Sequence, residues 1–306
     1  MNYYLAPLEG ITGFIYRTTY EKYFGGISKY FSPFITTNQH FAFQNRDKRD
    51  ILPENNEGLH LIPQVLTNNA EQFVDMLSKI EALGYQEVNL NLGCPSKTVV
   101  TKKKGSGFLA YPEELDRFLD EVFYHDRHME ISVKTRIGME DPEEFYRLLK
   151  IYNKYPLKEL IIHPRLQSDY YKNVPNMEIF RESIGLSKAP LCYNGDLFTV
   201  EDLKSFEAEF PQITNVMLGR GILKAPSLLR ELQGEPRDLA QWHAFLTELC
   251  ERYEKELSGD RNVLFKMKEL WFYLFQSLPD SQKNAKEMRK LKDLQEYRML
   301  VKRILM

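Results

Sequence analysis

The sequence predicts an α/β fold: a (β/α)₈ TIM barrel over residues 1–236, followed by a small all-α helical bundle over residues 237–306. Eight short runs rich in β-branched and aromatic residues are spaced along the first part of the chain. Amphipathic stretches lie between most of these runs. Eight strands alternating with helices over about 230 residues match this barrel, whose typical length is roughly 250 residues.

Several of the segments between the strand-like runs carry helix-start residues. Asn69 precedes Ala-Glu-Gln, and both Pro112 and Pro142 are followed by two glutamates, as is typical of a first helical turn. A doubly wound sheet is the alternative, but no G-x-G-x-x-G turn follows the first run. The predicted strands are residues 3–6, 30–35, 59–65, 87–91, 131–135, 159–163, 190–193 and 215–218.

The composition changes after Pro236. Strand-like runs and nearly all Gly and Pro end there, and apolar residues recur at helical spacing. We therefore predict three or more helices packed against the barrel. Residues 237–306 hold 14 Lys and Arg against 11 Asp and Glu, whereas the whole chain has a net charge of -2. The overall charge does not indicate a nucleic-acid binder, but the C-terminal part offers a local positive surface.

The composition also excludes several classes of protein. With 43% hydrophobic and 27% charged residues, the chain is neither disordered nor fibrous. It has no long apolar run of membrane-spanning length and no secretory signal pattern at its start. Its cysteines, Cys94, Cys192 and Cys250, are few and widely spaced, which favours reduced thiols and no metal site. We expect a cytoplasmic monomer without a membrane partner.

Polar residues and glycines follow most of the predicted strands at their carboxyl ends, which converge on one mouth of a barrel. The turns Asn194-Gly195-Asp196 and Gly219-Arg220-Gly221 have the composition of a phosphate site, because glycine lets backbone N–H groups approach an anion. Either turn alone is more often a plain turn. Together they favour phosphate binding and an enzyme active site at this mouth.

Two other residues at strand ends are candidates for chemistry. Lys134 would be costly to bury without an anionic partner, so it is either a cation that stabilises ligand charge, a Schiff-base amine, or a solvated strand end. Cys94 opens a loop that carries Lys102, Lys103 and Lys104. A thiol beside a basic loop suits a phosphate-bearing macromolecular substrate, whereas Cys192 and Cys250 are expected to be inert core residues.

The sequence resembles the tRNA-dihydrouridine synthases over nearly the whole barrel, and the helical tail also agrees with this family. The N-x-G-C-P element, followed by Lys134-Thr135-Arg136 (K-x-R), is specific, and the glycine turns support it. The matching segments, in family order, are Ala6-Pro7-Leu8-Glu9-Gly10-Ile11-Thr12, Asn89-Leu90-Asn91-Leu92-Gly93-Cys94-Pro95, Lys104-Gly105-Ser106-Gly107, Val133-Lys134-Thr135-Arg136, His163-Pro164-Arg165, Tyr193-Asn194-Gly195-Asp196 and Gly219-Arg220-Gly221.

The resemblance implies a barrel that binds FMN, joined to a helical tRNA-binding domain, with NADPH as the reductant for uridines in tRNA. It places residues on three sides of the reaction. Cys94 would donate the proton, and the uracil would be oriented by Asn91 and Arg136, with Arg165 nearby, although Pro164 departs from the usual glycine. The expected flavin contacts are Pro7, Leu8, Glu9, Gln64 and Lys134 around the ring, and His163, Asn194, Gly195, Asp196, Gly219 and Arg220 around the phosphate.

Physical chemistry is consistent with these roles. Hydride arriving at C6 of uracil leaves C5 in need of a proton, and a thiol with a pKa of about 8.5 stays protonated at neutral pH. A uridine in folded tRNA must be extruded from its stack, at a cost of a few kcal/mol. Phosphate contacts from Lys102, Lys103, Lys104, Lys290 and Lys292 would offset that cost.

Three alternatives remain open at the level of sequence. A flavin barrel acting on a free pyrimidine, like the dihydroorotate dehydrogenases, shares the chemistry but gives no reason for the helical tail. A barrel lyase would use Lys134 as a Schiff base on a phosphorylated sugar. A non-catalytic RNA-binding module would not depend on Cys94.

Overall fold

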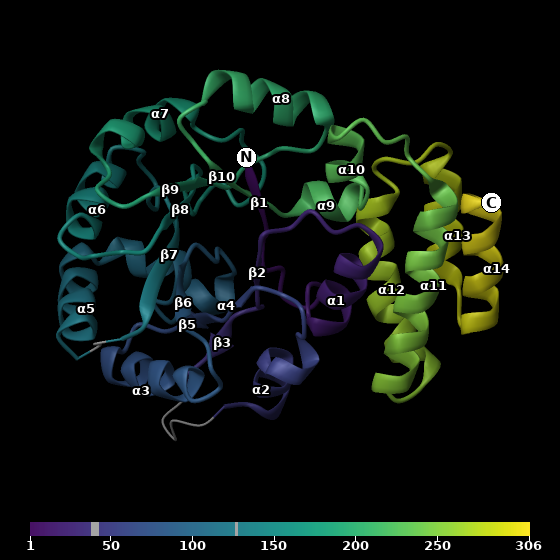
Figure 1. Cartoon of the computed structure of the whole chain (residues 1–306), viewed down its shortest axis with the longest axis horizontal. Coiled ribbons are helices and arrows are strands. Elements are labelled where there is room, and N and C mark those ends of the chain that lie inside the picture. Colours follow the sequence, from purple (N-terminus) through teal and green to yellow (C-terminus); the bar gives the residue numbers. More distant parts are fainter. Residues whose placement is uncertain (38–42, 126–127) are drawn as a thin grey trace.

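The computed structural model describes residues 1–37, 43–125 and 128–306, and its strands form one parallel sheet (Figure 1). Within that part of the chain the sheet has ten strands, in the order β3-β5-β6-β7-β8-β9-β10-β1-β2-β4. The strands are β1 Asn2–Leu5, β2 Lys29–Phe31, β3 Ile35–Thr36, β4 Leu61–Ile62, β5 Gln64–Leu66, β6 Glu87–Leu92, β7 Glu130–Arg136, β8 Leu160–His163, β9 Leu191–Tyr193 and β10 Asn215–Leu218.

The ten strands are eight in effect, because two of the predicted strands are each split in two. β2 and β3 are interrupted around Pro33, and β4 and β5 at Pro63, where proline cannot donate to the sheet. β2 pairs with β4 and β3 with β5, so the second and third strands are neighbours along both halves. The pairing of β1 with both β10 and β2 completes the ring. The predicted barrel fold is confirmed.

Helices surround the sheet, and their starts follow the predicted cap residues. The Asn69 side chain accepts the N–H of Gln72, and the fifth helix begins at Pro112. The next helix begins two residues after Pro142, because the Glu144 carboxylate accepts three N–H groups of residues 139–141 and holds a turn there. These helices are α1 Phe14–Tyr23, α2 Asn45–Ile51, α3 Ala70–Glu81, α4 Lys97–Val100, α5 Pro112–His125, α6 Glu144–Tyr152, α7 Met177–Leu186, α8 Val200–Glu209, α9 Arg220–Lys224 and α10 Leu228–Leu232.

Four further helices lie together at one end of the molecule, on the right in Figure 1, as the apolar spacing predicts. The first packs on α1, where the Phe245 ring lies 5.2 Å from Phe24 and 5.9 Å from Tyr16. The buried residues of these helices and of the barrel helices belong to one continuous core. The domain boundary at residue 236 stays a prediction. The four helices are α11 Leu239–Glu256, α12 Asp260–Leu274, α13 Ser281–Lys290 and α14 Leu294–Leu305.

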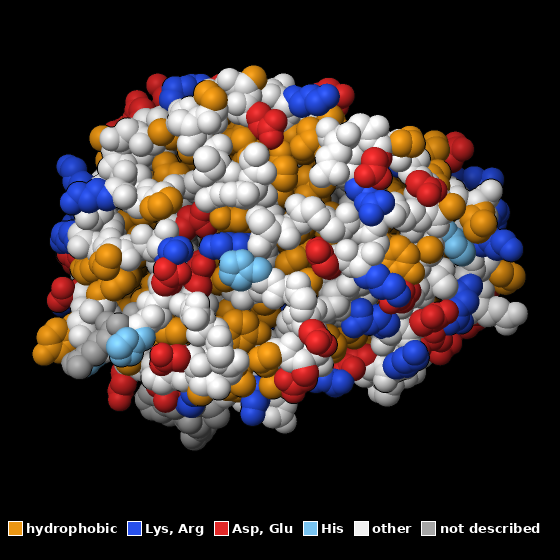
Figure 2. Space-filling view, viewed as in Figure 1, with side chains coloured by type: hydrophobic (Ala, Val, Ile, Leu, Met, Phe, Trp, Pro, Cys, Tyr) orange, Lys and Arg blue, Asp and Glu red, His pale blue; other side chains and the backbone are white. Residues whose placement is uncertain are grey.

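The barrel interior has a small apolar cluster of its own, below the carboxyl ends of the strands. It includes Tyr4, Phe31, Met217 and Cys192, all buried. Cys250 is buried in α11, so both cysteines are core residues, as expected. On the face drawn in Figure 2, positive and negative side chains are interspersed, in line with the small net charge.

Across the described ranges, no helix has the length and apolar composition needed to cross a membrane. The same residues contain no group of three or more His, Cys, Asp and Glu side chains arranged to hold a metal ion.

Candidate active site

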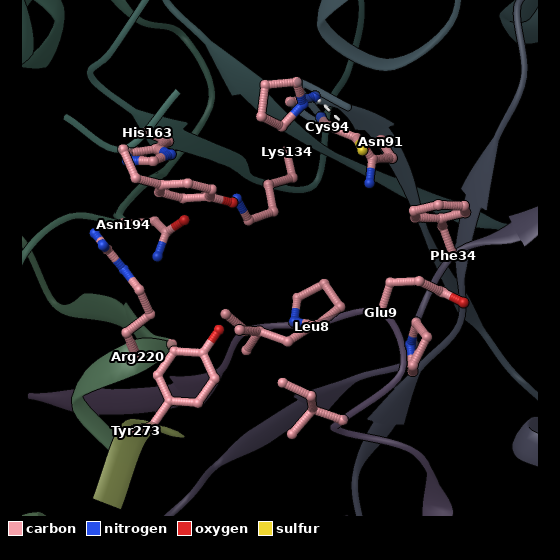
Figure 3. Close-up of a pocket in the computed structure, with 18 of the residues that line it drawn as sticks. Leu8, Glu9, Phe34, Asn91, Cys94, Lys134, His163, Asn194, Arg220 and Tyr273 are labelled. Atoms are coloured by element: carbon pink, nitrogen blue, oxygen red, sulfur yellow. Dashed lines mark hydrogen bonds between the residues drawn. The ribbon is translucent and has the colours of Figure 1, made fainter. Parts of the chain in front are cut away.

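A cavity of about 570 Å³ opens at the carboxyl ends of the barrel strands. Figure 3 shows Arg220 and His163 on one side of this cavity and Cys94 on the other. Residues far apart in the sequence meet here because the strands that carry them are neighbours in one parallel barrel. The predicted site residues that line the cavity are Pro7, Leu8, Glu9, Gln64, Asn91, Cys94, Lys134, His163, Asn194, Gly195, Asp196, Gly219 and Arg220.

Cys94 is held in a fixed turn after β6. The Asn91 side-chain oxygen accepts the N–H groups of Gly93 at 3.0 Å and Cys94 at 2.9 Å. The Cys94 carbonyl accepts both the N–H and the hydroxyl of Ser106, at 3.1 and 2.9 Å. Burial raises the pKa of the Cys94 thiol, although nearby Arg136 and Lys134 act in the opposite direction. The sulfur is therefore a protonated thiol at neutral pH, able to give a proton to a ligand.

A series of hydrogen-bonded side chains runs from Asn91 across the barrel. Asn91 donates to Gln64 at 2.7 Å, Gln64 donates to Asn89 at 2.7 Å, and Asn89 donates to Ser132 at 3.0 Å. These hydrogen bonds fix the orientation of the Gln64 amide at the cavity wall. No role at the site was predicted for Asn89 or Ser132, although the two-residue spacing of Asn89 and Asn91 on one strand places both on the same face.

Lys134 projects from β7 into the cavity (Figure 3). Among the described residues its ammonium has no hydrogen-bond or ion-pair partner. Burial lowers the pKa of Lys134 to about 8, and the nearby Arg136 guanidinium lowers it further. A buried ammonium without an acceptor is costly, so the position suits a ligand that carries negative charge or acceptor atoms.

Charged side chains gather at the ends of β8, β9 and β10. Asp196 accepts from Arg220 at 2.5 Å and from Arg165 at 3.1 Å. Arg165 also contacts Nε2 of His163 at 2.9 Å, and because arginine only donates, Nδ1 of His163 carries the ring proton. Burial, together with the surrounding arginines and Lys134, lowers the pKa of His163 well below its usual value. A neutral N–H donor, Arg220 and two glycine turns face one side of the cavity, which suits a phosphate.

Close packing requires two of the glycines at this side. A Cβ at Gly195 would overlap the Tyr193 side chain, and a Cβ at Gly221 would lie 2.2 Å from the carbonyl oxygen of Leu197. Gly219 has less severe constraints, with its nearest neighbour, the Cβ of Ala6, at 3.4 Å. These turns therefore bring backbone directly to the cavity wall.

Two predicted arginines lie behind the cavity wall rather than on its surface. Arg136 is fully buried and donates to the backbone carbonyls of Gly93, Leu166 and Tyr170. Arg165 is also buried and donates to the Asn173 carbonyl at 2.6 Å. Both side chains support the loops that border the cavity. Their predicted contacts with uracil stay predictions.

The five lysines predicted to contact tRNA phosphates lie at the surface and do not line the cavity. Lys102 and Lys103 are exposed in the turn after α4, where the Lys103 ammonium lies 3.9 Å from the centre of the Tyr111 ring. Lys104 is partly buried, and burial lowers its pKa. Lys290 and Lys292 are exposed at the end of α13 and just after it. Their predicted contacts with phosphates stay predictions.

The C-terminal helices contribute to the cavity, which the sequence analysis missed. Figure 3 shows Tyr273 of α12 pointing into the cavity, opposite the barrel strands. Residues 269, 272, 273 and 276 have the spacing of one helix face, distinct from the apolar face that packs in the core. This spacing is the sequence feature that could have predicted their place at the cavity. The lining residues that were not predicted include Phe34, Tyr171, Phe198, Glu269, Phe272, Tyr273 and Gln276.

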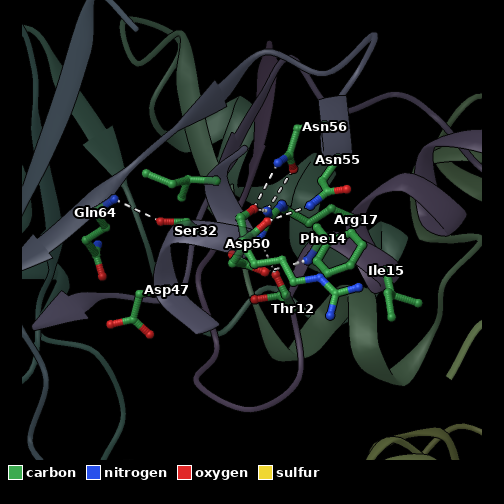
Figure 4. Close-up of polar contacts among 12 residues, drawn as sticks. Thr12, Phe14, Ile15, Arg17, Ser32, Asp47, Asp50, Asn55, Asn56 and Gln64 are labelled. Atoms are coloured by element: carbon green, nitrogen blue, oxygen red, sulfur yellow. Dashed lines mark hydrogen bonds and ion pairs between the residues drawn. The ribbon is translucent and has the colours of Figure 1, made fainter. Parts of the chain in front are cut away.

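A buried network fixes the first loop of the site (Figure 4). Arg17 is fully buried and donates to the Thr12 carbonyl at 2.8 Å, to Asp50 at 2.9 Å and to Asn56 at 2.8 Å. The other Asp50 oxygen accepts the N–H of Phe14, the first residue of α1, at 2.7 Å. Arg17 thus joins α1, α2 and the loop that carries Pro7, Leu8 and Glu9.

Comparison with known proteins decides the family. The family model described as dihydrouridine synthase (Dus) matches residues 4–304. The chain belongs to the dihydrouridine synthase family. It is 26% identical over 303 residues to a tRNA-dihydrouridine(16) synthase of Pseudomonas putida, covering 94% of this chain and 93% of that protein. A tRNA-dihydrouridine(16) synthase of Vibrio vulnificus is 26% identical, over 76% of this chain and 74% of that one.

Solved structures agree with this chain in fold. Morphinone reductase superposes with a TM-score of 0.53 at 12% identity, over 77% of this chain and 86% of its own. The old yellow enzyme homologue from Zymomonas mobilis gives a TM-score of 0.54 at 11% identity, over 79% and 92% of the two chains. At this level of identity the likeness concerns the barrel architecture alone.

The cavity of this dihydrouridine synthase family member fits a flavin. The Lys134 ammonium, which has no partner in the part of the chain that the structure describes, suits the polar edge of a flavin ring, which carries negative charge when reduced. Gly195 and Gly219 bring backbone to the side where His163 and Arg220 offer donors to a phosphate. The two groups of residues lie on the same cavity, as a ring joined to a phosphate requires.

Proposed function

We propose that this protein reduces uridine in tRNA to 5,6-dihydrouridine, using FMN as the bound cofactor and NADPH as the reductant. One observation carries the proposal: the protonated thiol of Cys94 lines the same cavity as the Lys134 ammonium, for which residues 1–37, 43–125 and 128–306 supply no partner. We place the reaction in the cytoplasm, with the monomer as the working unit.

The residues that would hold the flavin are those that line the cavity below Cys94. Pro7, Leu8 and Glu9 come from the loop after β1, and Gln64 from the start of β5. Lys134 would donate to the ring, and the residues that would bind the phosphate are His163, Asn194, Gly195, Asp196, Gly219 and Arg220. When bound, the flavin supplies the hydride that C6 of uracil accepts.

The chain's own residues then complete the reaction at C5. Cys94 holds a proton at Sγ, and Asn91 keeps the turn of Cys94 in place through its side-chain oxygen. Transfer of that proton to C5 yields the saturated ring and leaves a thiolate, which nearby Lys134 and Arg136 stabilise electrostatically. Water reprotonates the sulfur for the next turnover.

The direct test is to incubate the purified protein with NADPH and tRNA that lacks dihydrouridine. Mass spectrometry of nuclease fragments then maps each uridine that gains two hydrogens. Orotate and uracil serve as competing substrates, because reduction of a free pyrimidine without tRNA would favour the dihydroorotate dehydrogenase-like alternative. Borohydride trapping of Lys134 with a phosphorylated sugar, on a colourless protein, would instead favour a lyase.

A further inference from the structure

Two exposed phenylalanines on α12 continue outward from the cavity. Phe265 and Phe272 are seven residues apart, which is two helical turns, so their side chains lie on one face about 10 Å apart along the axis. Each ring keeps 67% of its surface exposed, and Phe272 also lines the cavity. We call these two residues the aromatic stripe.

The aromatic stripe differs from apolar residues scattered singly on a surface. Tyr171, which is 53% exposed, lines the same cavity from the loop between β8 and α7. Exposed aromatic rings that border a cavity are typical of an interaction site, whereas isolated ones are ordinary. Phe272 therefore places an exposed ring at the cavity rim, and Phe265 lies two turns away on the same helix, with Lys268 and Glu269 between them.

Basic side chains predominate on α13, the helix that lies next to α12. α13 packs against α12, and Lys268 of α12 donates to the Leu291 carbonyl at 2.7 Å just beyond α13. α13 carries four basic side chains, Lys283, Lys286, Arg289 and Lys290, against the single carboxylate of Glu287. Exposed rings next to cations are typical of surfaces that bind unpaired nucleic acid, because bases stack on the rings and phosphates pair with the cations. A second copy of this chain is a poorer occupant of this surface, because it would bring two basic α13 helices together and their charges would repel.

We propose that the aromatic stripe is a stacking platform for the unpaired nucleotides adjacent to the uridine that enters the cavity. The proposal rests on the proposed function. Extrusion of a base leaves the faces of its neighbours unstacked. Phe272, at the cavity rim, would stack on the first neighbouring base, and Phe265 would stack on a base further along the strand.

The test compares tRNA binding by four variants of the flavin-loaded enzyme: Phe265→Ala, Phe272→Ala, Phe272→Leu and Phe272→Trp. Tyr124→Ala is the matched control, since Tyr124 is an aromatic residue of α5 that is 77% exposed. We expect the two alanine variants to bind tRNA about ten-fold more weakly. The leucine variant keeps an apolar side chain without a ring and should bind as weakly, whereas tryptophan restores affinity.

A spectroscopic measurement reports stacking directly. With 2-aminopurine placed next to the target uridine, stacking on the wild-type platform quenches fluorescence, and Phe272→Ala should give a brighter complex. Equal affinity and equal brightness in Phe272→Ala and Tyr124→Ala would overturn the proposal, as would wild-type behaviour of Phe272→Leu. If the wild-type protein self-associates and Phe265→Ala abolishes this self-association, the stripe is a dimer interface and the proposal is overturned. If the wild-type enzyme forms no dihydrouridine, the proposed function itself fails.

Discussion

Gly105 packs against Cys94 with no space for a side chain. A Cβ at Gly105 would lie 2.8 Å from the Cys94 carbonyl oxygen and 3.1 Å from the Cys94 Cβ, and the residue has a φ of +57°. The segment that begins at Gly105 therefore fixes the position of the candidate proton donor.

We expect Gly105→Ala to lower kcat for tRNA reduction at least ten-fold, because the added methyl group displaces Cys94 and the positive φ strains alanine. Steady-state kinetics on tRNA measure the change. Gly185→Ala is the control, since a Cβ there meets nothing within 4 Å. Equal kcat in the two variants would contradict the positioning role.

Cys94→Ala should reduce turnover by about 10² to 10⁴, the usual contribution of a general acid, while tRNA still binds. Because the pKa of the thiol is raised, wild-type activity should persist through neutral pH and fall only as the pH rises through that raised pKa. Rates of dihydrouridine formation across pH check both points. Cys250→Ala, which lies outside the cavity, should retain activity, and a Cys94→Ala enzyme as fast as this control would exclude Cys94 as the donor.

Lys134→Met should stabilise the flavin-free protein at neutral pH. The folded-state pKa of about 8 lies below the ordinary value of 10.5, so the burial cost is fully present below pH 8 and disappears as the pH rises towards 10.5. The gain over wild type should be at most about 3 kcal/mol below pH 8 and should shrink with rising pH. Thermal unfolding of both proteins at a series of pH values from about 7 to 10.5 measures this difference in stability. The same variant should bind FMN more weakly, and unchanged FMN affinity would argue against the ring contact.

Arg17→Met should destabilise the protein by about 3–5 kcal/mol, because it leaves Asp50 without its buried partner. Urea denaturation gives the free energy of unfolding. Arg117→Met, an exposed arginine of α5, is the control and should have little effect. A loss of stability no larger than in the control would show that the network in Figure 4 is dispensable.

Neutralising Lys290 and Lys292 together, each to Gln, should weaken tRNA binding and lower the slope of log affinity against log salt by about 1 to 2. Titrations at several salt concentrations measure the slope. Lys150 and Lys188, exposed on and after barrel helices, provide the matched double variant. An unchanged salt slope would exclude phosphate contacts at the two predicted lysines.

Much of the barrel and half of the site follow from local sequence. Strand runs and helix caps depend on neighbouring residues, so Asn69 and Pro112 mark their helices correctly. The carboxyl ends of parallel strands meet at one mouth whatever the details of packing, so Cys94, Lys134 and Arg220 could be placed together from their positions alone.

Tertiary structure decided what depends on contacts across the chain. The sequence does not show that the Arg136 guanidinium donates its hydrogen bonds to three backbone carbonyls, because those carbonyls belong to two other loops. Nor does it show that α12 would turn Tyr273 into the cavity, because a helix contributes to a barrel mouth only through its docking. Each strand and the helix that follows it are encoded by neighbouring residues, and the barrel repeats this unit eight times. The orientation of a docked helix is instead set by a buried surface that is assembled only on folding.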